Sequence, residues 1–320
     1  MDRASTAAGR ARNRDRRNKV IPEDTTELPR LPNRDPNGHK GTFGTLSIVG
    51  GCALHESPMI GAPTLAALAA FRTGCGLVRL AMPTPILIAG LSLEPSATGI
   101  GLGVDDERNP IAGSDTLNLI GDADAIVVGP GFGSDRARNR PIAHLVSDCI
   151  GLGLPTVVDA DGLNALVTGE MLARIDLARC VLTPHPGEFV RLAKARGIAA
   201  DPTDESERPG AAAALAHSLG CVVVLKGAHT VVSDGTKSWV CDHGHACMAT
   251  AGTGDVLAGL IGSLIVQLRE FDFSLYDIAR LGVQTHATAG ERWSKRHQAD
   301  AGMFARELAD ELPKVISELR

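Results

Sequence analysis

The sequence predicts an α/β fold built on a mostly parallel central sheet, with helices on both faces. Six short apolar runs rich in Val, Ile and Leu alternate with stretches of helical spacing, which favours right-handed βαβ units. The composition agrees, because 44% of the 320 residues are hydrophobic, only 3% are aromatic and 36 are glycine. Polar and glycine-rich motifs follow four of the runs, as expected where ligands bind beyond the carboxyl ends of parallel strands.

The expected elements follow in order along the chain. Strands are predicted at 44–50, 77–82, 124–129, 155–159, 179–183 and 221–225, with helices at 62–73, 137–150, 162–168, 187–196 and 207–219. Segments 229–233 and 237–240 form an expected hairpin, because Asp234-Gly235 favours a tight turn. Three helices at about 255–269, 275–290 and 299–318 close the chain, and Pro313 predicts a kink in the last one.

A charge boundary near residue 19 divides the chain into a tail and a domain. Residues 1–19 contain seven Lys or Arg and two Asp, a charge of +5; because the whole chain carries −5, the remaining 301 residues carry −10. We expect residues 1–37 to be a charged, disordered tail, with nucleic-acid contact or organelle targeting as alternative roles. Residues 38–320 are expected to form one domain, since no strong linker interrupts them.

The charge and hydropathy of the domain exclude two classes of partner. Its acidic balance argues against nucleic acid as the main partner. No apolar run reaches the roughly 18 residues needed to span a bilayer, and the N-terminus lacks the apolar core of a secretory signal. We therefore predict a cytoplasmic protein without membrane contact.

The seven cysteines indicate a reducing compartment rather than a disulfide framework. Their number is odd, several lie in apolar runs, and none forms a Cys-x-x-Cys pair. The segment Cys241-Asp-His-Gly-His-Ala-Cys247 could bind zinc, but its period-two spacing splays the side chains and the usual ligand separation is missing. A polar loop is the favoured interpretation of this segment.

Residues 249–259, Ala-Thr-Ala-Gly-Thr-Gly-Asp-Val-Leu-Ala-Gly, predict a helix that begins at an anion-binding turn. The glycines leave no Cβ in the way, so Gly252, Thr253 and Gly254 can turn backbone N–H groups toward one anion. Asp255 follows at or beside the N-cap. Its carboxylate either caps the helix or acts as the base for a phosphoryl transfer at this anion hole.

Four motifs follow the later strands. They are Gly129-Pro-Gly-Phe-Gly133, Asp159-Ala-Asp-Gly-Leu-Asn164, Thr183-Pro-His-Pro-Gly-Glu188 and Lys226-Gly-Ala-His-Thr230. Each also has an ordinary explanation, because a glycine after a strand is often a tight turn and an acid often opens a helix. A further motif, His39-Lys-Gly-Thr-Phe-Gly44, precedes the first strand and is either a ligand approach or a plain entry loop.

Four side chains in these motifs are candidates for ligand contact. Asp159 and Asp161 either cap a helix or pair around a cation or a substrate hydroxyl. His185 is held stiffly between two prolines, which favours a binding role over a mobile surface position. Lys226 ends a buried strand and therefore requires a counter-anion, which a phosphate would supply.

Together with Ala251-Gly-Thr-Gly-Asp255, these motifs resemble, in order and spacing, the ADP/ATP-dependent NAD(P)H-hydrate dehydratase family over about residues 38–318. The resemblance implies a three-layer α/β/α ribokinase-like fold. It implies a lyase that repairs the S epimer of hydrated NADH or NADPH, with ADP or ATP as co-substrate. Many members carry a fused N-terminal epimerase domain; 37 residues are too few for one, so we expect a separate epimerase as pathway partner. We also expect a homo-oligomer.

The resemblance assigns roles to named residues. The adenine nucleotide is assigned to Lys226, Gly227, Ala228, His229, Thr230 and Gly254, and the hydrated dinucleotide to Ala62, Gly131, Gly133, His185 and Asp255. Ala62 lies in Met59-Ile-Gly-Ala-Pro63, which departs from the commoner Pro-Gly-Ala form of the family. Asp255 would deprotonate the ring hydroxyl while the anion hole holds the migrating phosphoryl group. Magnesium would bridge the nucleotide phosphates, with Glu188 orienting it through water.

Two other functions fit parts of the pattern. A ribokinase-like kinase for a thiazole or pyrimidine alcohol would share the anion hole and Asp255, but would have no reason to keep Thr183-Pro-His-Pro-Gly187. A nucleotide sensor that has lost catalysis would not need an intact Asp255 and Lys226. Product analysis separates the first alternative, since a kinase accumulates a phosphorylated alcohol and a dehydratase releases free phosphate; an activity assay separates the second.

Overall fold

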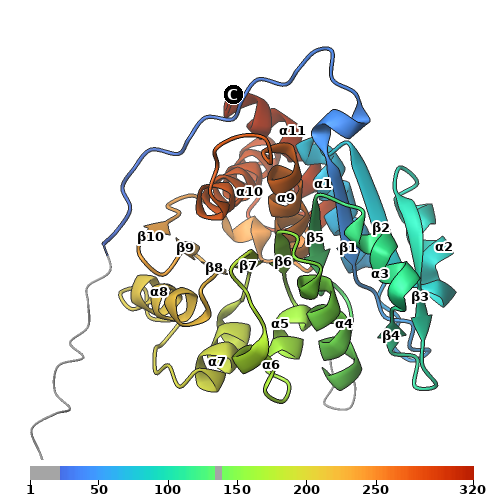
Figure 1. Ribbon diagram of the computed structural model, residues 1–320. Coiled ribbons are helices and arrows are strands. Elements are labelled where there is room, and N and C mark those ends of the chain that lie inside the picture. The colour runs from blue at the N-terminus through green and yellow to red at the C-terminus, as the bar shows by residue number, and fades with distance from the viewer. Residues whose placement is uncertain (1–21, 134–138) are drawn as a thin grey trace, which may run out of the picture.

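A ten-stranded sheet runs through the part of the chain that the computed structural model describes, residues 22–133 and 139–320. The strands are β1 (Thr45–Val49), β2 (Leu77–Pro83), β3 (Thr98–Val104), β4 (Pro110–Ile111), β5 (Ala125–Val128), β6 (Thr156–Val158), β7 (Cys180–Leu182), β8 (Val222–Leu225), β9 (Val231–Ser233) and β10 (Ser238–Val240). Their order is β10-β9-β8-β7-β6-β5-β1-β2-β3-β4 (Figure 1). In this spatial order the seven neighbouring strands β8-β7-β6-β5-β1-β2-β3 are parallel, whereas β9, β10 and β4 pair in antiparallel fashion. The predicted mostly parallel sheet is confirmed.

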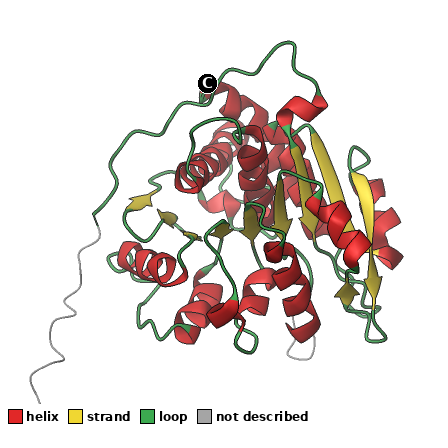
Figure 2. Cartoon of the chain, in the orientation of Figure 1, coloured by secondary structure: helices red, strands yellow, loops and turns green. Residues whose placement is uncertain are grey.

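Helices cover both faces of the sheet, as the ribbon in Figure 1 and the colouring in Figure 2 show. One face carries α1 (Gly61–Thr73), α2 (Thr84–Leu93), α9 (Thr253–Gln267), α10 (Leu275–His297) and α11 (Ala305–Glu318). The other carries α3 (Ser114–Gly121), α4 (Asn139–Gly151), α5 (Asp161–Leu166), α6 (Met171–Arg174), α7 (Pro186–Ala195) and α8 (Arg208–Leu219). Short 3-10 helices η1 (Lys40–Phe43) and η2 (Ala246–Met248) precede β1 and α9. The predicted three-layer α/β/α fold is confirmed.

Each face of the sheet buries its own apolar core. Successive side chains of a strand point to opposite faces, so Val127 of β5 packs in one core while Ile126 and Val128 pack in the other. Both faces of the central strands are therefore covered, which explains why their sequences are continuously apolar rather than alternating.

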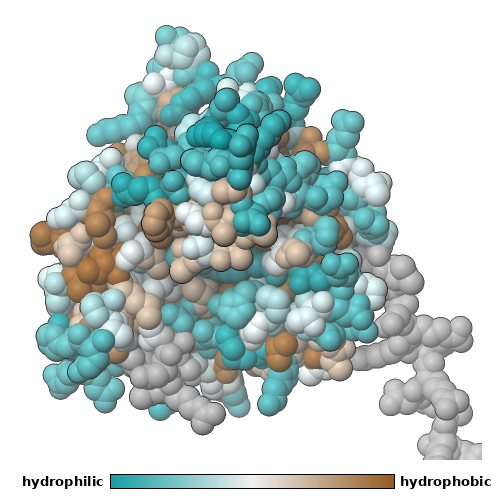
Figure 3. Space-filling model, turned by 180° about the vertical axis from the view of Figure 1, so that it is seen from behind, coloured by the Kyte–Doolittle hydropathy of each residue, from teal (hydrophilic) through white to brown (hydrophobic). Residues whose placement is uncertain are grey.

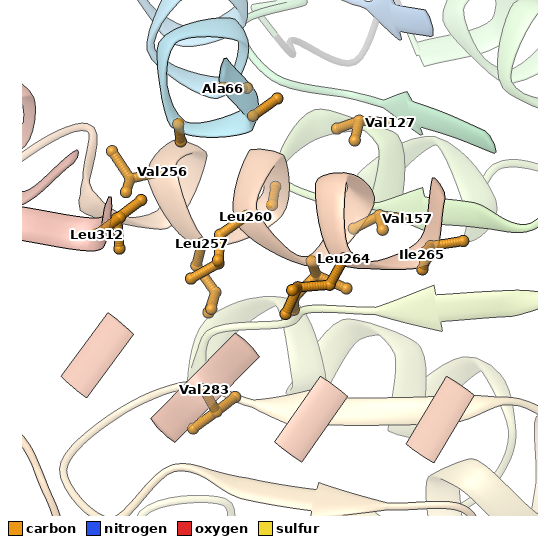
Figure 4. Close-up of a cluster of buried hydrophobic side chains, with 14 of the residues drawn as sticks. Ala66, Val127, Val157, Val256, Leu257, Leu260, Leu264, Ile265, Val283 and Leu312 are labelled. Atoms are coloured by element: carbon orange, nitrogen blue, oxygen red, sulfur yellow. The ribbon is translucent and has the colours of Figure 1, made fainter. Parts of the chain in front are cut away.

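Helix α9 is the most deeply buried helix of the first face. Its residues from Val256 to Val266 are all buried. Figure 4 shows Leu257, Leu260 and Leu264 among side chains from α1, the sheet, α10 and α11. A Cβ at Gly259 would lie 2.0 Å from the carbonyl oxygen of Ala66, so glycine is required where α9 crosses α1. The turn that begins α9 is therefore attached to a rigid, fully packed element.

The segment between β2 and β5 forms four elements that the sequence did not predict: α2, β3, β4 and α3. Helix α2, Thr-Pro-Ile-Leu-Ile-Ala-Gly-Leu-Ser-Leu, contains no charged residue and has little helical amphipathicity. Strand β3 contains three glycines, which are disfavoured in strands. These glycines are used for close packing; a Cβ at Gly99 would lie 2.9 Å from Leu91 of α2.

The predicted disorder of the tail is wrong for residues 22–37, while residues 1–21 lie outside the described residues. Leu31 is buried in the core and its N–H donates to the carbonyl of Leu319 at 2.8 Å. Asp24 is also buried, and its N–H donates to the carbonyl of Ser238 in β10 at 2.7 Å. Low average hydrophobicity did not reveal that a few side chains of this segment are anchored.

Some large apolar side chains are exposed at the edge of the molecule formed by α2 and β3. Figure 3, which views the molecule from behind, shows a brown group at the edge where α2 and β3 lie in Figure 1. Ile88 and Leu93 of α2 are among the exposed large apolar residues. Within the described ranges, no helix is long and apolar enough to cross a membrane. Pro313 lies inside α11 without ending it.

Candidate active site

Polar groups from several motifs meet where the carboxyl ends of β6, β7 and β8 face the start of α9. Asp159 follows β6, Thr183 follows β7 and Lys226 follows β8. The Nζ of Lys226 donates to Oδ1 of Asp159 at 2.7 Å, and Oγ1 of Thr183 donates to the same oxygen at 2.7 Å. The parallel sheet thus brings together residues that are 24 and 67 positions apart in the sequence.

The counter-charge of Lys226 comes from the protein itself. Asp159 is almost fully buried, and Oε2 of Glu188 lies 4.0 Å from the Lys226 Nζ. Burial lowers the pKa of Lys226, but the negative charges of Asp159 and Glu188 outweigh it and raise the pKa above its usual value. A phosphate is therefore not needed to neutralise Lys226, contrary to the sequence-based expectation. Asp159 is not a helix cap either, since Ala160 is the N-cap of α5.

The backbone between the two site aspartates is strained. Ala160 has φ 50° and ψ −123°, a conformation that costs a non-glycine residue about 1–3 kcal/mol. The carboxylates on either side hold it in place, because Asp159 binds Lys226 and Asp161 Oδ2 accepts the N–H of Gly133 at 2.7 Å. Strain of this kind concentrates at functional sites, where surrounding contacts over-determine the geometry.

The anion-hole turn adopts the conformation that its glycines predict. Gly252 is the N-cap of α9, with φ 93°. The N–H groups of the first helical turn have no acceptor within the helix, so Thr253 and Gly254 can present theirs to an anion. A Cβ at Gly254 would lie 3.5 Å from the Nζ of Lys226, which places this ammonium beside the turn. Asp255 is the third residue of the helix and not its N-cap, so the simple capping explanation does not apply.

Two carboxyl groups of the site are protonated more readily than usual. Burial, followed by the charge of Asp159 and also that of Asp161, raises the pKa of Asp255 to about 7, against the opposing charge of Lys226. Burial likewise raises the pKa of Glu188 to about 7. One ammonium is thus surrounded by several carboxylates, and a carboxylate with a pKa near neutrality is well matched to proton abstraction.

The Thr183–Glu188 motif builds the first turn of α7. His185 is its N-cap: Nδ1 accepts the N–H of Gly187 at 3.0 Å, and the ring remains half exposed. Glu188 completes a capping box, because its Oε2 accepts the N–H of His185 at 2.8 Å. Burial, and then the charge of Lys226, lowers the pKa of His185. The ring is therefore oriented by the backbone through Nδ1, its Nε2 lies 3.4 Å from Oε1 of Glu188, and about half of the side chain remains exposed.

A side-chain metal site does not fit this arrangement. Across residues 22–133 and 139–320, no group of three or more His, Cys, Asp or Glu residues could hold a metal ion. Glu188 is buried and already engaged by a backbone N–H. The role of Glu188 in orienting magnesium through water stays a prediction, and a magnesium ion here would depend on oxygens that a bound nucleotide brings.

The loop after β5 lies against the start of α1. A Cβ at Gly131, which has φ 71°, would lie 3.1 Å from the Cβ of Ala62, so the two predicted substrate residues are neighbours. At Gly129, with φ 124°, a Cβ would lie 1.9 Å from the carbonyl oxygen of Asp159. Glycine is thus needed for the close approach of this loop to the Asp159–Asn164 motif.

A chain of hydrogen bonds ties α7 to this loop. Nε of Arg191 donates to Asn164 Oδ1 at 2.8 Å, and Nδ2 of Asn164 donates to Asp161 Oδ1 at 3.2 Å. The other oxygen of Asp161 accepts the N–H of Gly133. Arg191 was not predicted, because a basic residue on an exposed helix face carries no local signal.

The Lys226–Thr230 loop is shaped by unusual backbone angles and by a buried arginine. Gly227 has φ 144° and His229 has φ 53°, while Gly227, Ala228 and His229 are exposed. Oγ1 of Thr230 donates to the carbonyl of Gly227 at 2.9 Å. The buried Arg208 donates to the carbonyl of Leu225, the last residue of β8, at 3.0 Å. Arg208 was not predicted, because a basic residue at the start of an alanine-rich helix carries no local signal.

Two motifs lie outside this site. The His39–Gly44 motif forms η1 at the amino end of β1, the opposite edge of the sheet, which supports the plain entry loop. The Cys241–Cys247 segment does not bring its four side chains together as a metal site: the thiols are buried, and Nδ1 of His243 lies 3.1 Å from Glu291. In the structure this segment is a loop that leads into η2.

Comparison with known proteins finds relatives of similar sequence and solved structures of similar fold. A family model described as NAD(P)H-hydrate dehydratase matches residues 46–314. The ADP-dependent (S)-NAD(P)H-hydrate dehydratase of Neisseria meningitidis is 36% identical over 282 residues, which cover 86% of either chain. A bifunctional NAD(P)H-hydrate repair enzyme of Moorella thermoacetica is 36% identical over 303 residues. The chain spans about half the length of this enzyme and of its Salinibacter ruber counterpart, 52% and 51% respectively.

Solved structures agree. The ADP/ATP-dependent NAD(P)H-hydrate dehydratase of Bacillus subtilis, co-crystallised with ATP and Mg²⁺, superposes with a TM-score of 0.70 at 25% identity, covering 92% of this chain and 99% of that one. A ribokinase from Cryptococcus neoformans superposes with a TM-score of 0.52 at 14% identity, covering 86% of this chain and 99% of that one, which shows the ribokinase-like fold alone. On the evidence of the family match and the relative of similar length, the chain belongs to the NAD(P)H-hydrate dehydratase family.

Proposed function

We propose that this protein dehydrates the S epimer of hydrated NADH and NADPH, with ADP or ATP as co-substrate. The observation that carries the proposal is the position of Asp255, a carboxylate with a pKa of about 7 in the first turn of α9, directly after the predicted anion hole. Family membership supports the choice of substrate, and the relative from Neisseria meningitidis carries the corresponding name.

In the proposed reaction Asp255 acts as the general base. It takes the proton of the ring hydroxyl while that oxygen attacks the terminal phosphorus of the nucleotide, and the bond from phosphorus to the bridging oxygen breaks with its electron pair on the leaving nucleotide. The bond between the ring carbon and the phosphorylated oxygen then breaks, and free phosphate leaves with the electron pair of this bond. Loss of a proton from the neighbouring ring carbon restores the ring double bond. The N–H groups of Gly252, Thr253 and Gly254 would stabilise the charge of the migrating phosphoryl group.

The substrates are proposed to bind on either side of this turn. The adenine nucleotide would contact Lys226–Thr230 and Gly254, which the proximity of the Lys226 ammonium to Gly254 supports. The hydrated dinucleotide would contact Ala62, the Gly131–Gly133 loop and His185. The adjacency of Ala62 and Gly131 and the exposed ring of His185 support this arrangement. Magnesium would be held by the nucleotide phosphates and would add positive charge to the phosphoryl group in transfer.

The test is an assay of purified protein with hydrated NADH, first with ADP and then with ATP. NADH absorbance and free phosphate should rise together, one phosphate for each NADH, with at least one of the two nucleotides. Accumulation of a phosphorylated alcohol without phosphate release would favour the small-molecule kinase instead. Absence of turnover with both nucleotides, in a protein that still binds them, would favour a sensor.

Three further expectations remain proposals. A separate epimerase would supply the S epimer; the bifunctional NAD(P)H-hydrate repair enzymes among the relatives support this expectation. The protein is proposed to form a homo-oligomer, which sedimentation velocity at micromolar concentration would test; a single monomer peak would contradict it. A cytoplasmic location is proposed from the function, since the hydrated cofactors arise where NADH and NADPH are used.

A further inference from the structure

Helix α10 packs closely against α9 and η2 through one of its faces. Gly282, His286 and Gly290 follow one another at intervals of four residues, so they lie on the same side of the helix. A Cβ at Gly282 would lie 2.6 Å from Cγ1 of Ile261, and one at Gly290 would lie 2.3 Å from Sδ of Met248. The two glycines thus allow α10 to pack against α9 and η2, with the ring of His286 between them.

The ring of His286 reaches the backbone of the anion-hole turn. Its Nε2 lies 2.8 Å from the carbonyl oxygen of Thr253. A carbonyl oxygen only accepts, so this nitrogen carries the hydrogen and donates it. Burial, opposed by this hydrogen bond and assisted by the charge of Lys226, lowers the pKa of His286 to about 4. The ring is therefore neutral at physiological pH and has one N–H, which it uses here.

This contact fixes more than a carbonyl. The carbonyl of Thr253 and the N–H of Gly254 belong to one planar peptide group, in which they point in opposite directions. The hydrogen bond from His286 to the Thr253 carbonyl therefore also sets the direction of the Gly254 N–H. This N–H is one of the groups that would face the transferred phosphoryl group. The side chain of Thr253 holds the same turn, because its Oγ1 donates to the carbonyls of Met248 and Thr250 at 3.1 and 3.0 Å.

We propose that His286 is a positioning residue for the reaction: it orients the peptide group between Thr253 and Gly254 so that the Gly254 N–H points at the transferred phosphoryl group. This inference rests on the proposed function. His286 touches neither substrate in this account, and its effect is exerted entirely through the backbone of the turn. It should therefore govern the rate of phosphoryl transfer rather than the affinity for nucleotide.

Three variants test the proposal. In His286→Gln the side-chain amide nitrogen can occupy the place of Nε2. The side chain of His286→Asn is too short for its amide nitrogen to reach the Thr253 carbonyl. His286→Leu removes the donor and keeps an apolar side chain in its place. We expect kcat to fall about tenfold to a hundredfold in the Asn and Leu variants, because misdirecting one donor of an anion hole weakens charge stabilisation. The Gln variant should keep at least about a third of wild-type kcat, and KM for the nucleotide should stay within about threefold in all variants.

A merely structural role predicts a different pattern. Equal kcat losses in the Gln and Asn variants, or wild-type kcat in the Asn variant, would overturn the proposal. If His286→Leu does not fold, the comparison of Gln with Asn decides alone, since both are polar and differ only in reach. Thermal midpoints of these two variants serve as the control, because a difference in kcat at equal midpoints cannot come from stability.

A binding readout separates this proposal from the proposed function. ADP with orthovanadate imitates the phosphoryl group in transfer, so it should raise the thermal midpoint of the wild type and the Gln variant beyond ADP alone, and should not do so in the Asn variant. That pattern in a protein without turnover of hydrated NADH would reject the proposed substrate and keep the role of His286. Absence of both turnover and the orthovanadate effect in the wild type would reject both.

Discussion

Two clusters of charge around buried carboxylates in this protein have opposite balances. In the site cluster, defined as Lys226, Asp159, Glu188 and Asp255, one cation faces three carboxylates. In the anchor cluster, defined as Asp24, Lys237, Tyr276 and Arg280, one carboxylate faces two cations and a phenol hydroxyl. In the first cluster the carboxylates outnumber the cation, whereas in the second the buried Asp24 meets two cations; Arg280 also lies 3.3 Å from the partly exposed Asp277.

The anchor cluster stabilises the fold. Oδ2 of Asp24 lies 3.3 Å from the Lys237 ammonium and 3.4 Å from the Arg280 guanidinium, and it accepts the Tyr276 hydroxyl at 3.0 Å. Burial raises the pKa of Asp24, but hydrogen bonds from Thr26 and Tyr276 and the charge of Arg280 lower it far below its usual value. The carboxylate is thus more stable in the folded protein than in water, and it fixes the N-terminal segment to α10.

The site cluster behaves in the opposite sense. Its carboxylates at Asp255 and Glu188 are less stable as anions than they would be in water, since their pKa values rise to about 7. A carboxylate whose pKa is raised in this way is destabilised as an anion in the folded protein, and it therefore accepts a proton more readily as a base. The direction of the pKa shift, more than the presence of a buried ion pair, therefore distinguishes the proposed catalytic cluster from the structural one.

The largest effect is expected from Asp255→Asn. Asn keeps the size of the side chain but does not accept a proton, so turnover of hydrated NADH should fall by about 10²–10⁴. Steady-state kinetics and nucleotide binding by calorimetry provide the measurement, with binding expected to persist.

A matched control for this change is Glu307→Gln. Glu307 is also a first-turn acid, and its Oε2 accepts the N–H of Phe304 at 2.8 Å at the start of α11. This helix start lies beside the anion-hole turn, since a Cβ at Gly252 would be 2.9 Å from the Cβ of Ala305, so the control tests an acid near the turn that only caps a helix. Its turnover should stay within about twofold of wild type, because a cap contributes to stability and not to the reaction. An Asp255→Asn variant as active as Glu307→Gln would remove Asp255 from the mechanism.

Lys226→Met should both weaken nucleotide binding and destabilise the protein by about 3 kcal/mol, because it leaves buried carboxylates without their cation. The loss of stability is a new expectation, since the sequence alone suggested that Lys226 contacts only the nucleotide. Urea unfolding of the ligand-free protein measures it.

The same change in the anchor cluster, Lys237→Met, is the control, because the Lys237 side chain is 40% exposed and its loss should cost less than about 1 kcal/mol. Equal losses at the two positions would show that the site cluster is no more dependent on its cation than an exposed pair. A normal nucleotide affinity in Lys226→Met would move the phosphate site elsewhere.

Asp24→Asn should reduce the free energy of unfolding by about 2 kcal/mol at neutral pH while leaving kcat unchanged, because Arg280 then loses a buried counter-charge. The sign with pH follows from the lowered pKa of Asp24: its stabilisation is present above its usual pKa of 3.8 and disappears as the carboxylate is protonated in acid. Unfolding curves at neutral pH and at about pH 3 measure the beginning of this loss, because at pH 3 the unfolded chain is largely protonated at this position while the folded carboxylate is still ionised. A large drop in kcat with intact stability would assign this cluster to catalysis.

The smallest effect is a gain in stability. The native pKa of Asp255, about 7, exceeds its usual value of 3.8, so the wild type loses stability as the pH rises through this interval. Asp255→Asn does not titrate and should unfold about 2–4 °C above the wild type at about pH 8, and at nearly the same temperature at about pH 4. A lower midpoint for the variant at both pH values would show that the carboxylate stabilises the fold.

Much of the site was predictable from the sequence because parallel strands bring their carboxyl ends together. The apolar runs located β5 to β8, and the residues after them therefore marked the site. The glycines at 252 and 254 predicted the turn that begins α9 for the same local reason. The pairing of Lys226 with Asp159 was not predictable, because it depends on which strands are neighbours and how far each side chain reaches.

Residues that act from a distance gave no local signal. His286 lies in the middle of a long helix, and only the packing of α10 against α9 shows which backbone group it meets. The segment 84–121 was left unassigned for a related reason, since glycines in β3 and the uncharged α2 contradict the usual propensities and are tolerated through tertiary contacts. Asp24 and Leu31 were hidden in a charged segment whose average composition indicates disorder.

The pH dependence of kcat/KM for hydrated NADH tests most directly whether burial, together with the neighbouring carboxylates, prepares Asp255 as a base. Because kcat/KM reports the free protein, it should rise with pH, inflect at about pH 7 and level off above it. Glu188→Gln, which removes the other carboxyl group with a raised pKa, should keep the inflection. A profile that is flat from about pH 5 to 9, or an inflection that disappears in Glu188→Gln, would contradict the assignment of the base to Asp255.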